Sequence, residues 1–425
     1  MMITGFIASQ KATGNAYTAL PWLASPVMRV SGTTSPGICR FLHGSAKSLP
    51  RLLLVLLTFG HYLGLASRRH ADLATMYGPL TVLAALLPFT SAQLDTYAKK
   101  AGLKYFGAAT DSPGQRERAG LEASYAKYDA ILRDGNEFGT TTPTNGQKWL
   151  FTEPEQGVFN FTEGDIVTAI AQEQGLIQRC HALVWHSQLA PWVEAKKDWT
   201  KETLSAVVVE HVTKVMEHYR GKCYAWDVVN EALDEDGTYR KSVFYNVLGE
   251  DFIKLAFRTA AAVEPGVKLY YNDYNIEKPS PKSDGVLRIV HMLQDDGIKI
   301  DGIATINAYG ALGVEVAYTE LDVRQNTPVN ATSLEWQANA YRDAVGACVQ
   351  AKACIGITIW DFYDPFSWVP YTFPGEGAAL LWFEDFTKHP AYDAIIEAMK
   401  NGTTSPCKQK QRRRAQIAAR SAKLE

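Results

Sequence analysis

Short apolar runs and longer helical patterns alternate along the middle of the chain. Eight of the runs are rich in β-branched and aromatic residues, which is typical of buried strands. They are Tyr105–Ala108, Glu137–Thr140, Arg179–Trp185, Ala225–Val229, Lys268–Asn272, Lys299–Ile303, Glu315–Thr319 and Gly356–Trp360. Helical patterns separate them at Leu121–Arg133, Lys201–Tyr219, Asp251–Val263, Asp284–Asp296 and Leu334–Val349. This alternation predicts an α/β fold, a closed (β/α)8 barrel of the TIM type. No Gly-rich phosphate turn supports the alternative, a doubly wound open sheet.

The sixth repeat is too short. Only 16 residues separate Lys299, which begins the sixth strand, from Glu315, which begins the seventh. An average βα unit takes about 30 residues, so a full helix does not fit between these two strands. We therefore predict a truncated sixth βα unit, and we expect the neighbouring strand edges to be exposed. We interpret the missing segment as lost from the gene prediction, not in evolution.

The two ends of the chain differ from the middle. Residues 1–75 are interpreted as a doubtful leader that is not native. In residues 76–92, the apolar stretch Leu80–Phe89 precedes Thr90-Ser91-Ala92, a small-x-small cleavage signal, which predicts a secretory signal peptide although no Lys or Arg precedes it. We expect residues 93–400 to form one enzyme-sized domain and residues 401–425 to form a basic flexible tail, which we interpret as solvated.

Composition narrows the function classes. The formal net charge of −2 gives no global field for nucleic acid or an anionic membrane. Six Cys without paired C-x-x-C spacing predict no zinc site, and Arg51–Ala66 is too short to span a bilayer, so we expect no stable membrane association. Sequons at Asn160, Asn330 and Asn401 fit a secreted glycoprotein.

Polar residues gather where the predicted strands end. These ends read His186-Ser187-Gln188, Asn230-Glu231, Asp273-Tyr274-Asn275, Glu320-Leu321-Asp322 and Asp361. Barrel enzymes build their sites at this rim, so Glu231 and Glu320 are expected to face one another across it. Two such carboxyl groups, about 5–5.5 Å apart, are what a retaining glycosidase needs.

Six motifs, in order, resemble glycoside hydrolase family 10, the retaining endo-1,4-β-xylanases. The first two are Trp226-Asp-Val-Val-Asn-Glu-Ala-Leu233 and Tyr318-Thr-Glu-Leu-Asp-Val323. The other four motifs are also similar to those of the family. They are Asn136-Glu-Phe-Gly139 with Asn145 and Lys148-Trp149, His181-Ala-Leu-Val-Trp-His-Ser-Gln188, Asn272-Asp-Tyr-Asn275, and Ile359-Trp-Asp361 with Ser367-Trp368.

The resemblance implies a role for each matching residue. Glu231 would be the general acid/base and Glu320 the nucleophile, while Asn230 would bond the sugar 2-OH. The implied substrate-binding residues are Asn145, Lys148, His181, Trp185, Gln188, Asn230, Tyr274, Asp322, Trp360 and Trp368. The resemblance further implies a secreted enzyme that acts on xylan and xylo-oligosaccharides without metal or organic cofactor, and we expect a monomer.

Two positions depart from the family pattern. The family has Gln-x-His at the end of the sixth strand, and its His contacts both the nucleophile and the Asp of Glu-Leu-Asp. Neither residue is present here, so Asp322 is expected to lose its partner and Glu320 a hydrogen bond. Thr144 stands where the family usually has Glu, which puts one sugar contact in doubt.

The cysteines fit the same resemblance. Cys348 and Cys354 resemble the family's disulfide at the eighth strand. Cys180 and Cys223 precede neighbouring strands and could pair. Cys39 and Cys407 have no evident partners.

Two other functions remain open. One is another retaining barrel glycosidase, acting on glucan, mannan or a plant glycoside, because the two carboxylates are common to such barrels. The other is a sugar-binding protein that is catalytically impaired by the truncation and binds through Trp360, Trp368 and Lys148 without turnover.

Overall fold

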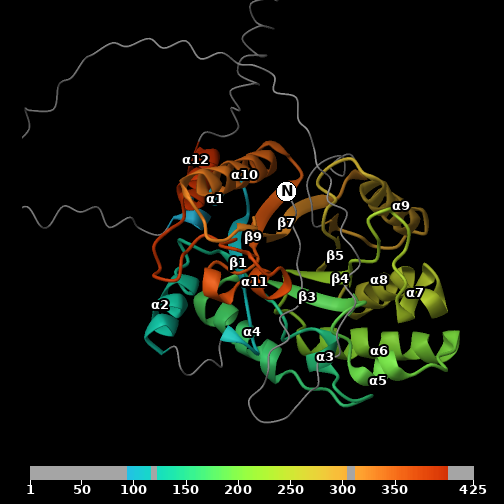
Figure 1. Cartoon of the computed structure of the whole chain (residues 1–425). Helices are drawn as coiled ribbons and strands as arrows, with labels where there is room; N and C mark the ends of the chain where they lie inside the picture. The colour runs from blue at the N-terminus through green and yellow to red at the C-terminus, as the bar shows by residue number, and fades with distance from the viewer. Residues whose placement is uncertain (1–92, 116–121, 304–311, 401–425) are drawn as a thin grey trace, which may run out of the picture. The chain divides into compact units, whose positions relative to one another are not determined.

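The computed structural model describes residues 93–115, 122–303 and 312–400 (Figure 1). Eight parallel strands close into a barrel in the order β1-β2-β3-β4-β5-β6-β7-β9, which confirms the predicted (β/α)8 fold. Their bounds are β1 Tyr105–Thr110, β2 Thr140–Pro143, β3 Ile177–Trp185, β4 Ala225–Asn230, β5 Lys268–Asn272, β6 Gly302–Ile303, β7 Glu315–Leu321 and β9 Cys354–Ile359. A separate antiparallel pair joins β8, Gln325–Asn326, to β10, Glu376–Gly377.

Helices cover the outside of the barrel (Figure 1). The longer ones are α2 Glu122–Leu132, α4 Thr162–Gln174, α6 Lys201–His218, α8 Asp251–Val263, α9 Pro281–Asp295, α10 Ala331–Gln350 and α12 Pro390–Lys400. The shorter ones are α1 Leu94–Lys100, α3 Trp149–Thr152, α5 Pro191–Ala195, α7 Val243–Leu248, the 3-10 turn Asp364–Phe366 and α11 Val369–Thr372. All five predicted helices are present, with ends that differ by at most three residues.

Capping residues explain where several helices begin. Thr200 accepts a hydrogen bond from the backbone N–H of Thr203 at the start of α6, and Asn330 does the same for Ser333 at the start of α10. These contacts satisfy N–H groups that have no partner inside the first helical turn, which stabilises each helix start by about 1 kcal/mol.

The predicted second strand was placed three residues too early. The prediction was Glu137–Thr140, but β2 begins at Thr140. The backbone N–H groups of Glu137 and Phe138 both donate to the carbonyl of Asp134, at 2.9 and 3.0 Å, so they close the turn after α2. The Glu137 carboxylate instead accepts from the backbone N–H of Gln93 at 2.6 Å, at the start of α1.

The sixth strand is the shortest of the barrel. The prediction was Lys299–Ile303, and β6 contains only Gly302 and Ile303. These two residues pair with Tyr270 and Tyr271 of β5 on one side and with β7 on the other, so the barrel closes through them. Residues 304–311 lie outside the described residues, and the truncated sixth unit stays a prediction.

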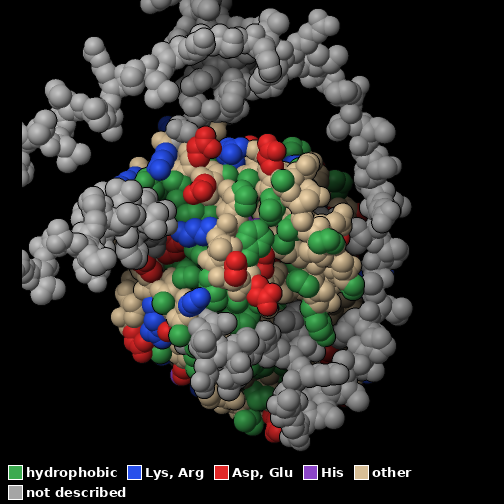
Figure 2. Space-filling view, turned by 60° about the vertical axis from the view of Figure 1, so that its left-hand side comes forward, with side chains coloured by type: hydrophobic (Ala, Val, Ile, Leu, Met, Phe, Trp, Pro, Cys, Tyr) green, Lys and Arg blue, Asp and Glu red, His purple; other side chains and the backbone are tan. Residues whose placement is uncertain are grey.

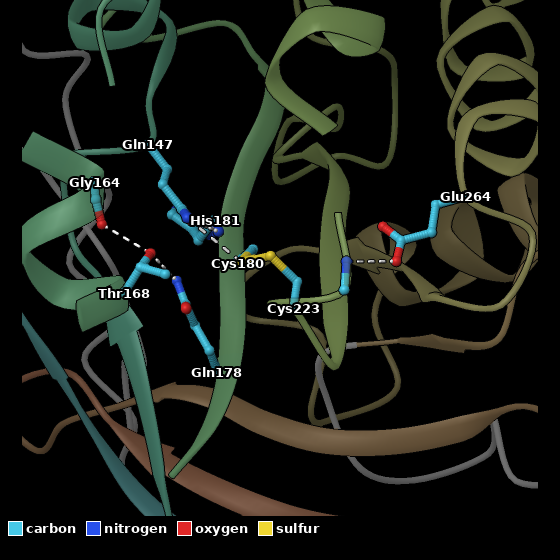
Figure 3. Close-up of a disulfide and its surroundings, with 9 residues drawn as sticks. Gln147, Gly164, Thr168, Gln178, Cys180, His181, Cys223 and Glu264 are labelled. Carbon is cyan, nitrogen blue, oxygen red and sulfur yellow. Dashed lines mark hydrogen bonds between the residues drawn. A yellow bond between two sulfur atoms is a disulfide. The ribbon is translucent and has the colours of Figure 1, made fainter. Parts of the chain in front are cut away.

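Two disulfides link the barrel elements. Cys348 at the end of α10 joins Cys354 of β9, with Cα atoms 5.3 Å apart, as the resemblance implied. Cys180 of β3 joins Cys223, which lies just before β4, with Cα atoms 5.8 Å apart (Figure 3). The second pairing, left open by the sequence, is therefore present. Cys39 and Cys407 lie outside the described residues.

Three sequence predictions cannot be followed in space. The leader 1–75, the signal peptide 76–92 and the basic tail 401–425 lie outside the described residues. Among the helices that are described, none is long and apolar enough to cross a membrane. On the face drawn in Figure 2, Lys and Arg side chains lie among Asp and Glu side chains.

Candidate active site

Four non-glycine residues adopt left-handed backbone conformations just after barrel strands. They are Gln188 after β3, Glu231 after β4, Asn275 after β5 and Asp361 after β9, with φ values of 46°, 52°, 56° and 64°. Such a conformation costs a non-glycine residue on the order of 1 kcal/mol. Its concentration at the carboxyl ends of strands marks this rim as the place where backbone strain is tolerated.

A cavity opens at this rim, and it collects most of the predicted site residues. Nine of the twelve predicted catalytic and substrate-binding residues line it: Asn145, Lys148, His181, Trp185, Asn230, Glu231, Glu320, Trp360 and Trp368. The other lining residues are Asp111, Gln115, Thr144, Asp361 and Phe366. The eight strands thus bring residues from both ends of the domain to one place.

Glu231 is buried in this cavity. The indole Nε1 of Trp185 donates to its Oε2 at 3.0 Å, and its backbone N–H donates to the carbonyl of Asn272 at 2.9 Å. Burial, together with the negative charges of Glu320 and Asp273, raises the pKa of Glu231 to about 8. A carboxyl group with such a pKa holds its proton at neutral pH and can donate it.

Glu320 lies in the same cavity but has different neighbours. The amide Nδ2 of Asn272 donates to its Oε1 at 2.6 Å, and Thr319 fixes that amide by donating to Asn272 Oδ1 at 2.7 Å. Burial and the negative charge of Asp227 raise the pKa of Glu320, while His181, the Asn272 hydrogen bond and Lys148 oppose the rise. The Asn272 hydrogen bond, His181 and Lys148 therefore stabilise the ionised form of Glu320 against the effect of burial.

A buried ion pair holds His181 beneath the cavity. Its Nδ1 lies 2.9 Å from Asp227 Oδ2, and the other oxygen of Asp227 pairs with Arg179. All three side chains are almost fully buried. Burial alone would raise the pKa of Asp227, but Arg179 and His181 lower it overall. The backbone N–H of His181 donates to Gln147 Oε1 at 3.1 Å, beside the Cys180–Cys223 disulfide (Figure 3).

Lys148 is held in place by amide groups. Its Nζ donates to Gln188 Oε1 at 2.6 Å and to Asn145 Oδ1 at 3.1 Å, and it lies 4.6 Å from the centre of the Trp185 ring. Burial lowers the pKa of Lys148 to about 8. Gln188 is not among the lining residues, but its half-buried side chain holds one of them in place.

Two predicted site residues lie away from the cavity surface. The hydroxyl of Tyr274 accepts from Arg240 Nη2 at 3.1 Å, and Lys282 Nζ lies 3.4 Å from the centre of the Tyr274 ring. Asp322 lies behind Trp368, whose Nε1 donates to Asp322 Oδ2 at 2.6 Å. The expected loss concerns the family's His, which the sequence lacks, and the Trp368 indole is a different partner for one of the Asp322 oxygens.

The second oxygen of Asp322 has no hydrogen-bond partner within the described part of the chain. Burial raises the pKa of Asp322 to about 8, against the effect of the Trp368 hydrogen bond. A buried carboxyl group without a cationic partner is stable in its neutral form.

Sequence reasoning missed the contribution of the first strand. Asp111 follows β1, and its Oδ2 accepts from Asn145 Nδ2 at 2.6 Å. Burial raises the pKa of Asp111 to about 7. Gln115 Nε2 donates to Asp361 Oδ2 at 2.5 Å. Asp111 directly after a buried strand was the available signal, whereas Gln115 and Phe366 lie in loops whose course the pattern does not give.

No group of three or more His, Cys, Asp or Glu that could hold a metal ion occurs in residues 93–115, 122–303 and 312–400. The cavity offers the carboxyl groups of Glu231 and Glu320 in different environments, together with an ammonium group and indole rings. This combination on a closed barrel defines a glycosidase-type site.

Comparison with known proteins narrows this class. Residues 93–398 match the family described as Glycosyl hydrolase family 10. Endo-1,4-β-xylanase A of Humicola insolens is 61% identical over 344 residues, which cover 77% of this chain and 91% of that protein. The chain therefore belongs to glycosyl hydrolase family 10.

Solved structures agree with this assignment. An endo-1,4-β-xylanase of Penicillium canescens superposes with a TM-score of 0.69 at 40% identity, covering 73% of this chain and 98% of that chain. A xylanase 10B of Thermotoga petrophila, solved in complex with xylobiose, gives 0.68 at 34% identity, covering 73% and 97%.

Proposed function

We propose that this chain is a retaining endo-1,4-β-xylanase. One observation carries the proposal: Glu231, whose pKa is raised to about 8, and Glu320, which accepts a hydrogen bond from Asn272, line one cavity. Family membership and relatives named endo-1,4-β-xylanase support xylan as the substrate.

In the first step, a Glu320 oxygen attacks the anomeric carbon of the sugar and the glycosidic C–O bond breaks. Glu231 gives its proton to the leaving oxygen, so the outgoing sugar leaves as an alcohol. The product is an ester between Glu320 and the sugar. The Trp185 indole, bonded to Glu231, stabilises the carboxylate that forms when the proton leaves.

In the second step, Glu231 takes a proton from water while the water oxygen attacks the anomeric carbon. The ester bond breaks, Glu320 returns as a carboxylate, and Glu231 regains its proton. Lys148 and Asn145, fixed to each other and to Gln188, are proposed to bind sugar hydroxyls, and Trp360 and Trp368 to contact pyranose faces. Tyr274 and Asp322, which do not line the cavity, are proposed to act through Arg240 and Trp368.

We further propose that the catalytic domain, residues 93–400, is secreted as a monomer, and that residues 76–92 direct its export. Two disulfides support this location, because such bonds persist in oxidising compartments.

The test is release of reducing sugar from xylan by the full chain and by the Glu320→Ala and Glu231→Gln variants. Both variants are expected to lose on the order of 10⁴-fold in kcat, because each removes a group that acts in the transition state. Glu335→Gln, an exposed substitution on α10, is the matched control and keeps full activity. Mannan and mixed-linkage glucan are assayed in parallel, and a preference for either would overturn xylan as the substrate.

A folded chain without turnover would favour the sugar-binding alternative. Circular dichroism establishes folding, and titration with xylo-oligosaccharide then shows whether binding survives. Equal activity of the full chain and Glu320→Ala on xylan would contradict the proposed mechanism.

A further inference from the structure

A second hollow lies outside the catalytic cavity and shares no lining residue with it. It has a volume of about 980 Å³ and opens to solvent between the start of α10 and the β8–β10 pair. Such a volume is at the upper end of what small-ligand sites offer. Its lining includes Asn330, Thr332, Ser333, Trp336, Arg324 and Glu376.

Trp336 forms an apolar wall of this hollow. Its side chain is 49% exposed, whereas the other tryptophans of the described part of the chain are buried or half-buried. A single exposed apolar side chain is common on protein surfaces and means little alone. Here the exposed indole stands beside hydroxyl, amide and charged groups in one concavity. A flat apolar ring with hydrogen-bonding neighbours suits the apolar face and the hydroxyl groups of a pyranose.

Asn330 begins the sequon Asn330-Ala331-Thr332, and all three residues are exposed. Asn330 uses its oxygen to cap α10: Oδ1 accepts from the backbone N–H of Ser333 at 3.0 Å. The amide nitrogen Nδ2 is not needed for the cap. An N-linked sugar bonds to this nitrogen and leaves the carbonyl oxygen as an acceptor, so the helix cap and the modification are compatible.

We propose that Asn330 carries an N-linked glycan whose first sugars lie in this hollow against Trp336. The C–N bond forms between Nδ2 and the anomeric carbon of an oligosaccharide donated by a lipid diphosphate; the diphosphate leaves and Nδ2 loses one proton. The proposal rests on the proposed secretion, because this donor acts on chains that enter the secretory route. The covalent anchor lies in the lining, which favours the chain's own glycan over a free polysaccharide as the occupant.

The test uses the full chain produced in a filamentous fungus. Thr332→Ala destroys the sequon and keeps the Asn330 cap, while Thr332→Ser changes the same position and keeps the sequon. Peptide N-glycosidase treatment in heavy-oxygen water, followed by peptide mass mapping, is expected to mark Asn330 in the parent and Thr332→Ser and not in Thr332→Ala. Asn160, the other sequon in the described residues, reports independently whether the chain met the glycosylation machinery.

Contact with Trp336 is tested by acrylamide quenching of tryptophan fluorescence. The quenching that Trp336→Phe removes is assigned to Trp336. This component is expected to be about twofold larger in Thr332→Ala than in Thr332→Ser, because the sugar covers one face of the indole. Equal quenching in the two forms would overturn the contact.

Each remaining outcome separates this inference from the proposed function. Active enzyme in the medium with Asn330 unmodified overturns the inference alone. Retention in the cytosol with Asn160 and Asn330 both unmodified overturns the secretion as well. A modified Asn330 on a chain that does not cleave xylan supports the inference and overturns the proposed activity. A last outcome would overturn the glycan as the occupant and make the hollow a polysaccharide site. In it, Asn330 is unmodified in the parent, and added xylo-oligosaccharide protects Trp336 of Thr332→Ala from acrylamide quenching.

Discussion

The two sides of the barrel are built differently. On the strand 3–5 side, comprising β3, β4 and β5, neighbouring strands pair at five positions in each ladder. On the strand 6–9 side, comprising β6, β7 and β9, β6 contributes only two pairs to each neighbour. The ring is nevertheless closed, so closure itself needs little of the sixth strand.

The buried carboxyl groups show the consequence for the site. Asp227 on the strand 3–5 side has Arg179 as a partner, and its pKa is lowered despite burial. Asp322 on the strand 6–9 side has the neutral Trp368 indole, and burial raises its pKa to about 8. The same residue type at the same depth is therefore held in opposite charge states. Arg179 and His181 stabilise the charged form of Asp227, whereas burial and the nearby Glu320 carboxylate stabilise the neutral form of Asp322.

Breaking the strand 3–5 side should have the largest effect. Asp227→Asn leaves Arg179 as a buried charge without its partner, which is expected to lower the free energy of unfolding by about 3–5 kcal/mol. Urea denaturation measures this change. Asp343→Asn, an exposed substitution on α10, serves as the control and should change stability by less than about 0.5 kcal/mol. A loss below about 1 kcal/mol in Asp227→Asn would show that the ion pair does not distinguish the two sides.

Removing each disulfide in turn compares the two sides by the stability that is lost. Cys180–Cys223 closes a sequence separation of 43 residues, and Cys348–Cys354 one of only 6. In the chain-entropy description, losing the first costs about 4 kcal/mol and losing the second about 2 kcal/mol. Paired Cys→Ser variants compared by thermal unfolding test the order. A larger loss for the short loop would mean that native contacts near β9 outweigh the loop entropy.

Asp322→Asn should have the smallest effect. At pH 6 the carboxyl is neutral, so the amide is a close substitute and its oxygen still accepts from Trp368; stability is expected to change by no more than about 1 kcal/mol.

The pH dependence sharpens this prediction. The folded chain holds the Asp322 proton up to about pH 8, whereas the unfolded chain releases it near pH 3.9. Stability contributed by Asp322 therefore falls as pH rises between these values and levels off above pH 8. The Asn side chain of Asp322→Asn does not titrate, so the variant does not show this fall in stability. Its free energy of unfolding relative to that of the parent should therefore increase between pH 5 and pH 7.5. Parallel curves for the two proteins would contradict the neutral form.

Sequence patterns predicted the barrel well because buried parallel strands are continuous apolar runs. They placed β2 wrongly because the residues before it, Glu137 and Phe138, have apolar and polar character that fits a strand, yet their N–H groups close a turn on Asp134. That contact depends on where the preceding helix ends, and strand propensity does not report it.

The site was predictable to a similar degree. Polar residues directly after strands located Asn230, Glu231 and Glu320 at the rim, because the alternation of strand and helix fixes which strand ends share a face. It did not separate the residues that line the cavity from neighbours that do not, such as Asp322 and Gln188. That distinction depends on which side chain packs over which, and Trp368 covers Asp322 through a contact 46 residues apart in sequence.

The left-handed residues at the barrel mouth have a consequence for how such an enzyme can change. Gln188, Glu231, Asn275 and Asp361 follow strands, and in the described part of the chain no residue within a barrel strand adopts a left-handed conformation. Left-handed conformations are thus placed beside the catalytic residues and not within the barrel strands. Substitutions that stabilise the barrel strands can then accumulate without changing the backbone conformation of the residues after the strands. Thermal stability and catalytic turnover are therefore adjustable in separate parts of the protein.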